Sequence, residues 1–222
     1  MSRRVLTTLT AALLGLSLLT AGPAAQAGSE QDPEIADECN DGYLLVNEDA
    51  VVGPPPAMNV LAAWFEGVYE PGASEHVLSA IKATLQVCGD LDLVSPISPP
   101  DIAYGFGWDN GGCRQGIRLI RTSATPTEVH ARQTCAPEPT ARVTLPDSEY
   151  RIEGDRLIVT LRVEGPASEV MDGLAEGVTL GAPTAGSWFV INGDGSGAGS
   201  STVEGDTTGV GRDFIIGEDK PA

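Results

Sequence analysis

Residues 112–135, GCRQGIRLIRTSATPTEVHARQTC, decide the fold that this sequence predicts. Two of the four cysteines lie at its ends, and apolar residues alternate with polar ones around a polar loop. Alternation with a period of two is typical of a β-strand with one buried face. A hairpin centred on Ala124 pairs Leu119 with Val129, Ile117 with Ala131, Gln115 with Gln133 and Cys113 with Cys135. Directly opposed cysteines lie within disulfide distance, so we predict a hairpin closed by a Cys113–Cys135 bond.

The same register places polar side chains on the opposite face of the hairpin, where water can solvate them. These residues are Arg114, Arg118, His130, Arg132 and Thr134. The second histidine, His76, is expected at the start of a strand. A single surface histidine is usually inert, and we assign no role to either one.

Cys39 and Cys88 remain for each other if the hairpin bond forms. An even cysteine count in an exported chain favours disulfides, and the absence of any C-x-x-C spacing argues against zinc. We therefore predict a second bond, Cys39–Cys88, which ties the N-terminal part of the chain to the end of a strand.

The N-terminus has the pattern of a secretory signal peptide. Arg3 and Arg4 precede an apolar run over 5–19, and Ala25-Gln26-Ala27 matches a small-residue cleavage site. The run is short for a membrane anchor, which is the alternative. We expect cleavage after Ala27, by an export route that the sequence leaves open between the general and twin-arginine pathways, and a secreted product.

Charge restricts the partners. Loss of residues 1–27 removes two arginines and no acid, which moves the formal charge from −18 to −20. Such a field disfavours nucleic acid and anionic membranes. No later segment is apolar enough to span a membrane, so we expect no membrane span in the chain that remains after cleavage.

The rest of the chain predicts short strands separated by turns. We expect strands at 42–47, 58–66, 76–87, 102–108, 141–145, 149–153, 156–163, 188–191 and 214–216, with a short one around Val203. A two-residue turn at Gly154-Asp155 should pair Glu153 with Arg156. A helix is the alternative for 76–87, and one or two helical turns are expected within 168–177, with Ser168 as N-cap. The long loop 192–213 should be largely irregular.

These elements predict an all-β fold, a single antiparallel β-sandwich with one short loop helix and two disulfides. We divide the chain into a signal peptide at 1–27, a polar acidic leader at 28–41 and a sandwich domain at 42–222.

Four segments together resemble exported β-sandwich domains of the DOMON and carbohydrate-binding type. They are LAAWFE, LSAIKATLQVCGDL, IEGDRLIVTLRVEGPASEVMDGLAEGVTL and GRDFIIGE, and together they span most of the chain after residue 27. The resemblance implies a sandwich that binds sugars, haem or other proteins, in some cases with structural calcium. It transfers no functional residue, and neither the histidines nor the methionines are placed as haem ligands.

The sequence contains no familiar catalytic motif. It lacks H-E-x-x-H, G-x-S-x-G and a P-loop, and every cysteine has a structural partner, so we predict a non-enzyme. Tyr104, Trp108 and Trp188 are aromatic candidates for stacking on sugar rings, with burial in the core as the alternative.

The loop around Asn192, Asp194 and Ser196 has the oxygen spacing of half an EF-hand, and Asp206 could complete a looser cage together with Glu204 and Asp213. Calcium is therefore the one cofactor that we consider, against a solvated turn as the alternative.

Two functions remain. The first is an exported binding module, with carbohydrate as the candidate ligand. The second is a structural or protein-interaction domain of the extracellular proteome that has no small ligand.

Overall fold

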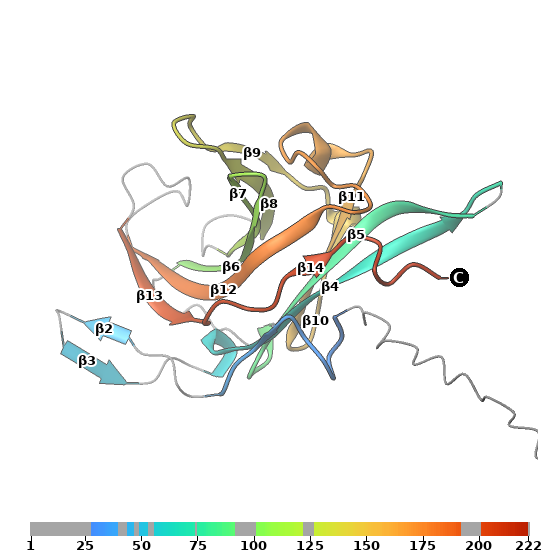
Figure 1. Ribbon diagram of the computed structural model, residues 1–222. Coiled ribbons are helices and arrows are strands. Elements are labelled where there is room, and N and C mark those ends of the chain that lie inside the picture. The colour runs from blue at the N-terminus through green and yellow to red at the C-terminus, as the bar shows by residue number, and fades with distance from the viewer. Residues whose placement is uncertain are drawn as a thin grey trace, which may run out of the picture.

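The computed structural model describes residues 28–39, 44–46, 49–52, 56–73, 75–91, 101–121, 127–191 and 201–221. Within these ranges the chain is all-β, with helical structure limited to the short 3₁₀ helices Pro56–Met58, Asp147–Glu149 and Pro166–Glu169. Figure 1 shows two antiparallel sheets packed as a sandwich, as the sequence predicts.

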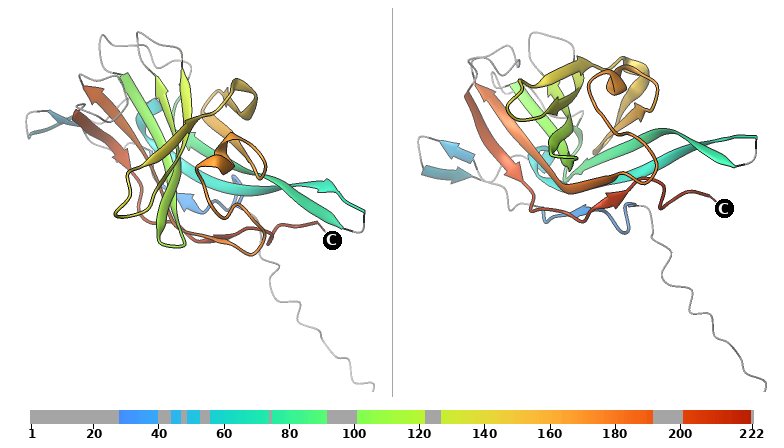
Figure 2. Two further views of the ribbon diagram at one scale, coloured as in Figure 1. Left: turned by 90° about the horizontal axis from the view of Figure 1, so that it is seen from above. Right: turned by 45° about the horizontal axis from the view of Figure 1, so that its top comes forward.

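The first sheet has five strands. In spatial order they are β1 (Ile35–Ala36), β4 (Val60–Pro71), β5 (His76–Val87), β11 (Arg156–Arg162) and β10 (Tyr150–Glu153). The hairpin of β4 and β5 projects beyond the rest of the sandwich (Figures 1 and 2). The strand prediction for 76–87 is confirmed, and so is the tight turn that pairs Glu153 with Arg156.

The second sheet is larger. Its order is β13 (Ser201–Thr207), β12 (Thr179–Ile191), β6 (Asp101–Asn110), β7 (Cys113–Arg121), β8 (Glu128–Thr134) and β9 (Ala141–Thr144), and β14 (Phe214–Ile215) also pairs with β12. A separate two-stranded ribbon consists of β2 (Leu44–Val46) and β3 (Asp49–Val52).

The predicted register of the hairpin is confirmed. Gln115 pairs with Gln133, Ile117 with Ala131, and Leu119 with Val129. Cys113 and Cys135 form a disulfide with a Cα–Cα distance of 4.3 Å, and Cys39–Cys88 is the second disulfide. The alternation of side chains therefore defines both the pairing of β7 with β8 and the face that each residue takes.

An aromatic cluster occupies the centre of the core. The ring of Phe65 from the first sheet stacks on that of Phe106 from the second at 4.6 Å, and it meets Trp108 edge-on at 5.1 Å. Phe214 packs on the same Phe65 ring at 5.5 Å. Such contacts between rings add to the burial of apolar area, so this cluster joins the two sheets.

The segment 28–39 is part of the sandwich, which corrects the expectation of a polar leader. Ile35 is 2% exposed and pairs with Ala63 in β4. The Glu34 side chain is buried, and its Oε2 accepts a hydrogen bond of 2.8 Å from the Phe65 amide. Arg212 donates its backbone N–H to the Glu34 carbonyl over 2.8 Å. The burial of Ile35 at the edge of the first sheet therefore holds this segment in the fold, although the residues around it are mostly acidic and polar.

Other predicted boundaries differ from those in the structure. β4 and β12 are each longer than predicted, because both continue through glycine and proline residues that usually interrupt strands. β13 confirms the short strand predicted around Val203 and is longer than expected for the segment 192–213. Ser168 is not the N-cap of its helix. Gly165 holds that position, and the Ser168 hydroxyl donates back to the Gly165 carbonyl over 2.7 Å.

Candidate functional site

The outer face of the second sheet carries an unusual set of side chains. Arg118 lies between Gly105 on β6 and His130 on β8, and Gly105 in turn pairs with Gly186 on β12. Two residues further along β8, on the same face, Arg132 lies opposite Arg142 on β9. The row therefore combines two glycines with cationic residues.

Trp188 lies across this row with its ring against the two glycines. A Cβ atom on Gly105 would lie 2.7 Å from Cζ3 of the Trp188 ring, and one on Gly186 would lie 3.0 Å from Cζ2. A Cβ atom on Gly186 would also lie 2.8 Å from the Asp206 carbonyl oxygen. A larger residue at either position would therefore displace the ring from where it lies. Trp188 is partly exposed, unlike the core aromatics. The result is an aromatic ring that lies over backbone and has exposed surface.

A shallow depression of about 130 Å³ opens beside this ring. Gly105, Arg118, Arg132 and Trp188 line it. The depression is thus bounded by an aromatic ring on one side and by two guanidinium groups on the other.

Arg118 is incompletely compensated in this position. Burial, followed by repulsion from Arg132 and Arg142, lowers the pKa of Arg118. Its Nε is buried and has no hydrogen-bond partner in the described part of the chain. Among the described residues, no acid forms an ion pair with Arg118 or Arg132. An anionic acceptor from outside the chain would satisfy Arg118 Nε and pair with the exposed guanidinium of Arg132.

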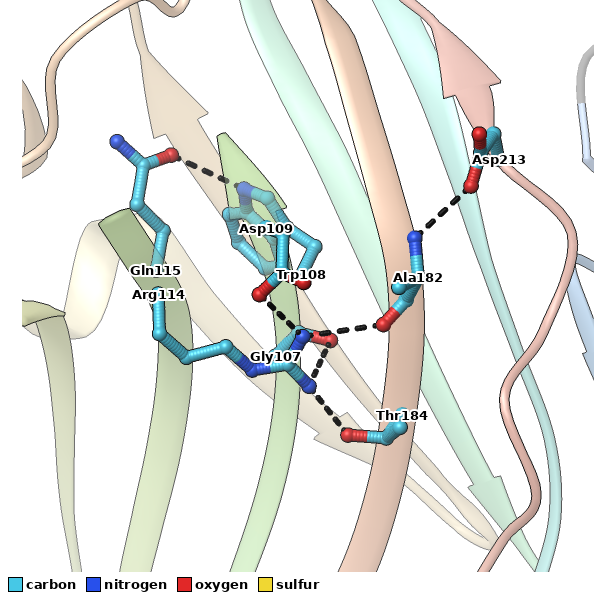
Figure 3. Close-up of polar contacts among 8 residues, drawn as sticks. All are labelled: Gly107, Trp108, Asp109, Arg114, Gln115, Ala182, Thr184 and Asp213. Carbon is cyan, nitrogen blue, oxygen red and sulfur yellow. Dashed lines mark hydrogen bonds and ion pairs between the residues drawn. The ribbon is translucent and has the colours of Figure 1, made fainter. Parts of the chain in front are cut away.

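Arg114, on the same face, has a structural role (Figure 3). It forms an ion pair of 3.0 Å with Asp109, and it donates to the carbonyls of Gly107 and Ala182 and to the Thr184 hydroxyl. On the other side of the strand, the Asp213 carboxylate accepts a 2.8 Å hydrogen bond from the Ala182 amide.

These contacts stabilise a bulge in β12. Ala182 has a φ of 45°, a left-handed conformation that is unfavourable for alanine. The pairing with β6 shifts by one residue between Gly181 and Thr184. Because faces alternate along a strand, the shift turns Gly186 and Trp188 outward and turns Ser187 into the core, where it is fully buried. The bulge is therefore what exposes Trp188.

His130 lies on the outer face, as predicted, but it is buried there and not solvated. It is only 9% exposed, with its Nε2 3.1 Å from a Glu128 carboxylate oxygen and its Nδ1 3.2 Å from the Thr144 hydroxyl. Burial lowers the pKa of His130, Glu128 opposes this, and the nearby Arg142 and Arg118 add to it. A neutral imidazole beside Arg118 avoids adding a further positive charge to the row.

Two of the three predicted stacking aromatics are in the core. Tyr104 and Trp108 are 0% exposed, so the alternative, burial in the core, holds for both and neither is available for stacking. The Tyr104 hydroxyl donates to the Ala57 carbonyl over 2.9 Å, and the Trp108 indole N–H donates to Gln115 Oε1 over 3.0 Å (Figure 3). Trp188 alone of the three lies at the surface.

The calcium prediction falls mainly outside the described residues, which exclude Asn192, Asp194 and Ser196. Asp206 is buried, and its Oδ2 accepts a hydrogen bond of 2.6 Å from the Val60 amide. In the ranges that the structure describes, no group of three or more His, Cys, Asp or Glu side chains is arranged to hold a metal ion.

Arg118 and Arg132 are the site residues that sequence reasoning missed. The hairpin register placed both on the outer face, and an excess of arginine on that face of an acidic chain was the available signal. Their position beside Trp188 depends on β12, whose pairing the sequence did not reveal.

Comparison with protein-family models, with curated protein sequences and with solved structures finds no significant match to this chain. The fold defines the class of protein as an all-β sandwich with two disulfides. None of the helices in the described ranges has the length and apolar character needed to cross a membrane.

Proposed function

We propose that this chain is an exported, non-catalytic binding module that holds a carbohydrate against the Trp188 ring. The single observation that carries the proposal is this ring, which is spread over Gly105 and Gly186 and borders a depression on an open sheet face. Sugar rings present apolar C–H surfaces, which pack on an aromatic face, while their hydroxyls bond to polar neighbours.

Export accounts for the scaffold. Disulfides persist in oxidising compartments, and both cysteine pairs are bonded here. The N-terminal sequence has the pattern of a cleavable signal peptide with a site after Ala27. Together they support a secreted protein that meets its ligand outside the cell.

Binding to a panel of soluble polysaccharides, measured by calorimetry, tests the proposal. We expect Trp188→Ala to weaken binding by roughly 10-fold or more, and Trp188→Phe to retain much of it because an aromatic face remains. Since Trp188 lies on the outer face, both variants should keep the near-ultraviolet circular dichroism of the native core. Equal binding by the wild type and Trp188→Ala would contradict the proposal.

A structural or protein-interaction domain is the second candidate, and the projecting β4–β5 hairpin favours it. Val77, near the tip of this hairpin, is 55% exposed and would lie in an interface formed there. Absence of binding to every polysaccharide, together with capture of a protein partner that Val77→Ser abolishes, would favour this candidate over the first.

A further inference from the structure

The charge of the depression beside Trp188 indicates what kind of sugar it would take. The chain has a formal charge of −18, yet four arginines lie on the outer face of three consecutive strands. They are Arg114, Arg118, Arg132 and Arg142. Like charges on directly opposed residues, as in the Arg132–Arg142 pair, destabilise a sheet unless something compensates them.

Compensation within the chain is unequal among these arginines. Arg114 has its acid, Asp109, and three further acceptors. Arg118 and Arg132, which line the depression, form no ion pair with any described acid, although the chain has 31 acidic residues. Arg118 also keeps its buried Nε without an acceptor among the described residues. A neutral sugar would leave both guanidinium charges without a counter-charge, whereas an anionic sugar would provide one.

We propose that the site binds an acidic saccharide, whose carboxylate or sulfate group is held by Arg118 and Arg132 while its ring packs on Trp188. This inference rests on the proposed function and specifies the ligand class of the same site. A guanidinium presents a planar fork of donors that matches carboxylate and sulfate oxygens, and binding supplies the acceptor that Arg118 Nε lacks.

The size of the depression agrees with one acidic ring as the anchored unit. About 130 Å³ is well below the roughly 300 Å³ at which pockets that enclose a whole small molecule begin. Further sugar units of a polymer would therefore lie along the open sheet face. A polyuronate and a sulfated glycan both provide the required anion, and the experiment separates them.

Calorimetry with matched pairs of polymers tests the inference. Polygalacturonate is compared with its methyl-esterified, neutral form, and dextran sulfate is compared with dextran. We expect one acidic polymer to bind at least roughly 10-fold more tightly than its neutral counterpart. Its affinity should also fall with added salt, because counterions compete for the guanidinium groups. The pair that shows the difference identifies carboxylate or sulfate.

Variants connect the effect to the two arginines. Arg118→Gln and Arg132→Gln should each reduce acidic-polymer binding by roughly 10-fold and lessen its salt dependence. Arg151→Gln is the matched control. It removes the same charge from the exposed edge strand β10, where Arg151 pairs with Glu153 at 2.6 Å, and it should leave affinity unchanged. Thermal unfolding checks that each variant is folded.

The possible outcomes separate this inference from the proposed function. Equal binding of acidic and neutral polymers, lost in Trp188→Ala but retained in both arginine variants, would overturn the acidic ligand and leave the carbohydrate module standing. An equal effect of Arg151→Gln would show general charge attraction and would also overturn it. Absence of binding to all four polymers would reject both.

Discussion

Glu34 should make the stability of this protein depend on pH, and Glu34→Gln should remove that dependence. The Glu34 side chain is 1% exposed, and burial raises its pKa from the ordinary 4.5 to about 7. The Phe65 amide, at 2.8 Å, and Arg212, whose Nη2 lies 3.6 Å from Oε1, act in the opposite direction without cancelling the effect. The fold thus favours the protonated acid.

The sign and size of the effect follow from this difference. A pKa that is higher in the folded chain than in the unfolded one gives stability that is complete below about pH 4.5. That stability is lost as the pH rises through about 7. The difference between the two pKa values corresponds to about 3 kcal/mol. A glutamine stays neutral and can still accept from the Phe65 amide, so at about pH 8 Glu34→Gln should be more stable than the wild type by up to about 3 kcal/mol.

Urea unfolding of the full-length chain, followed by tryptophan fluorescence at about pH 4, 6 and 8, measures the free energy of unfolding. The advantage of Glu34→Gln should be near zero at the lowest pH and should grow with pH. Glu38→Gln removes the same charge from an exposed position in the same segment and should show no such trend. A constant difference between Glu34→Gln and wild type at all three pH values would refute the reasoning.

A chain that begins at Gly28 provides a further check. A Cβ atom on Gly28 would overlap the Glu34 carboxylate, so Gly28 Cα lies directly against this group. A terminal ammonium at Gly28 would favour the ionised carboxylate and lower its pKa. The pH dependence should therefore shrink in this chain, and an unchanged dependence would place the new charge away from Glu34.

Three further outcomes are expected. Replacing Cys113 and Cys135 together by alanine should cost about 3 kcal/mol of stability, measured by urea unfolding, and should leave polysaccharide affinity intact because the bond belongs to the scaffold. Gln115→Ala should cost about 2–4 kcal/mol in the same assay, because it leaves the buried Trp108 indole N–H without its acceptor and opens a cavity. Calcium and a chelator should leave the melting temperature nearly unchanged, since Asp206 is already occupied by the Val60 amide; a large rise with calcium would contradict this expectation.

The sequence predicted the hairpin of β7 and β8 well because its alternation is unbroken and its cysteines follow the same register. The same alternation of side chains also predicts the burial of two aromatic residues. Tyr104 and Trp108 share their parity with Ile102 and Phe106, so they belong to the core face that these apolar residues define. Their residue type made the two rings candidates for stacking, whereas their alternation with Ile102 and Phe106 favours the alternative, burial in the core.

Other features depended on tertiary contacts that no local pattern reports. Glu34 is an acid in the interior, which composition argues against, and it is accommodated there by an amide of β4 and by Arg212 from the distant C-terminal part of the chain. The site required β12 to run beside β6, although Gly181 and Pro183 predict an interruption at that point. Sequence could therefore supply Arg118 and Arg132 as outward-facing residues but could not bring Trp188 beside them.

The bulge at Ala182 places one extra residue of β12 opposite β6, and this sets the facing of the rest of the strand. If the same residues paired regularly with β6, every residue after Gly181 would move one position along β6 and reverse its facing. Trp188 would then point into the core and Ser187 toward solvent, with the composition of the strand unchanged. A chain shorter by one residue between Gly181 and Thr184 would pair regularly and keep Trp188 outward, whereas loss of one residue between Thr184 and Trp188 would turn the ring inward.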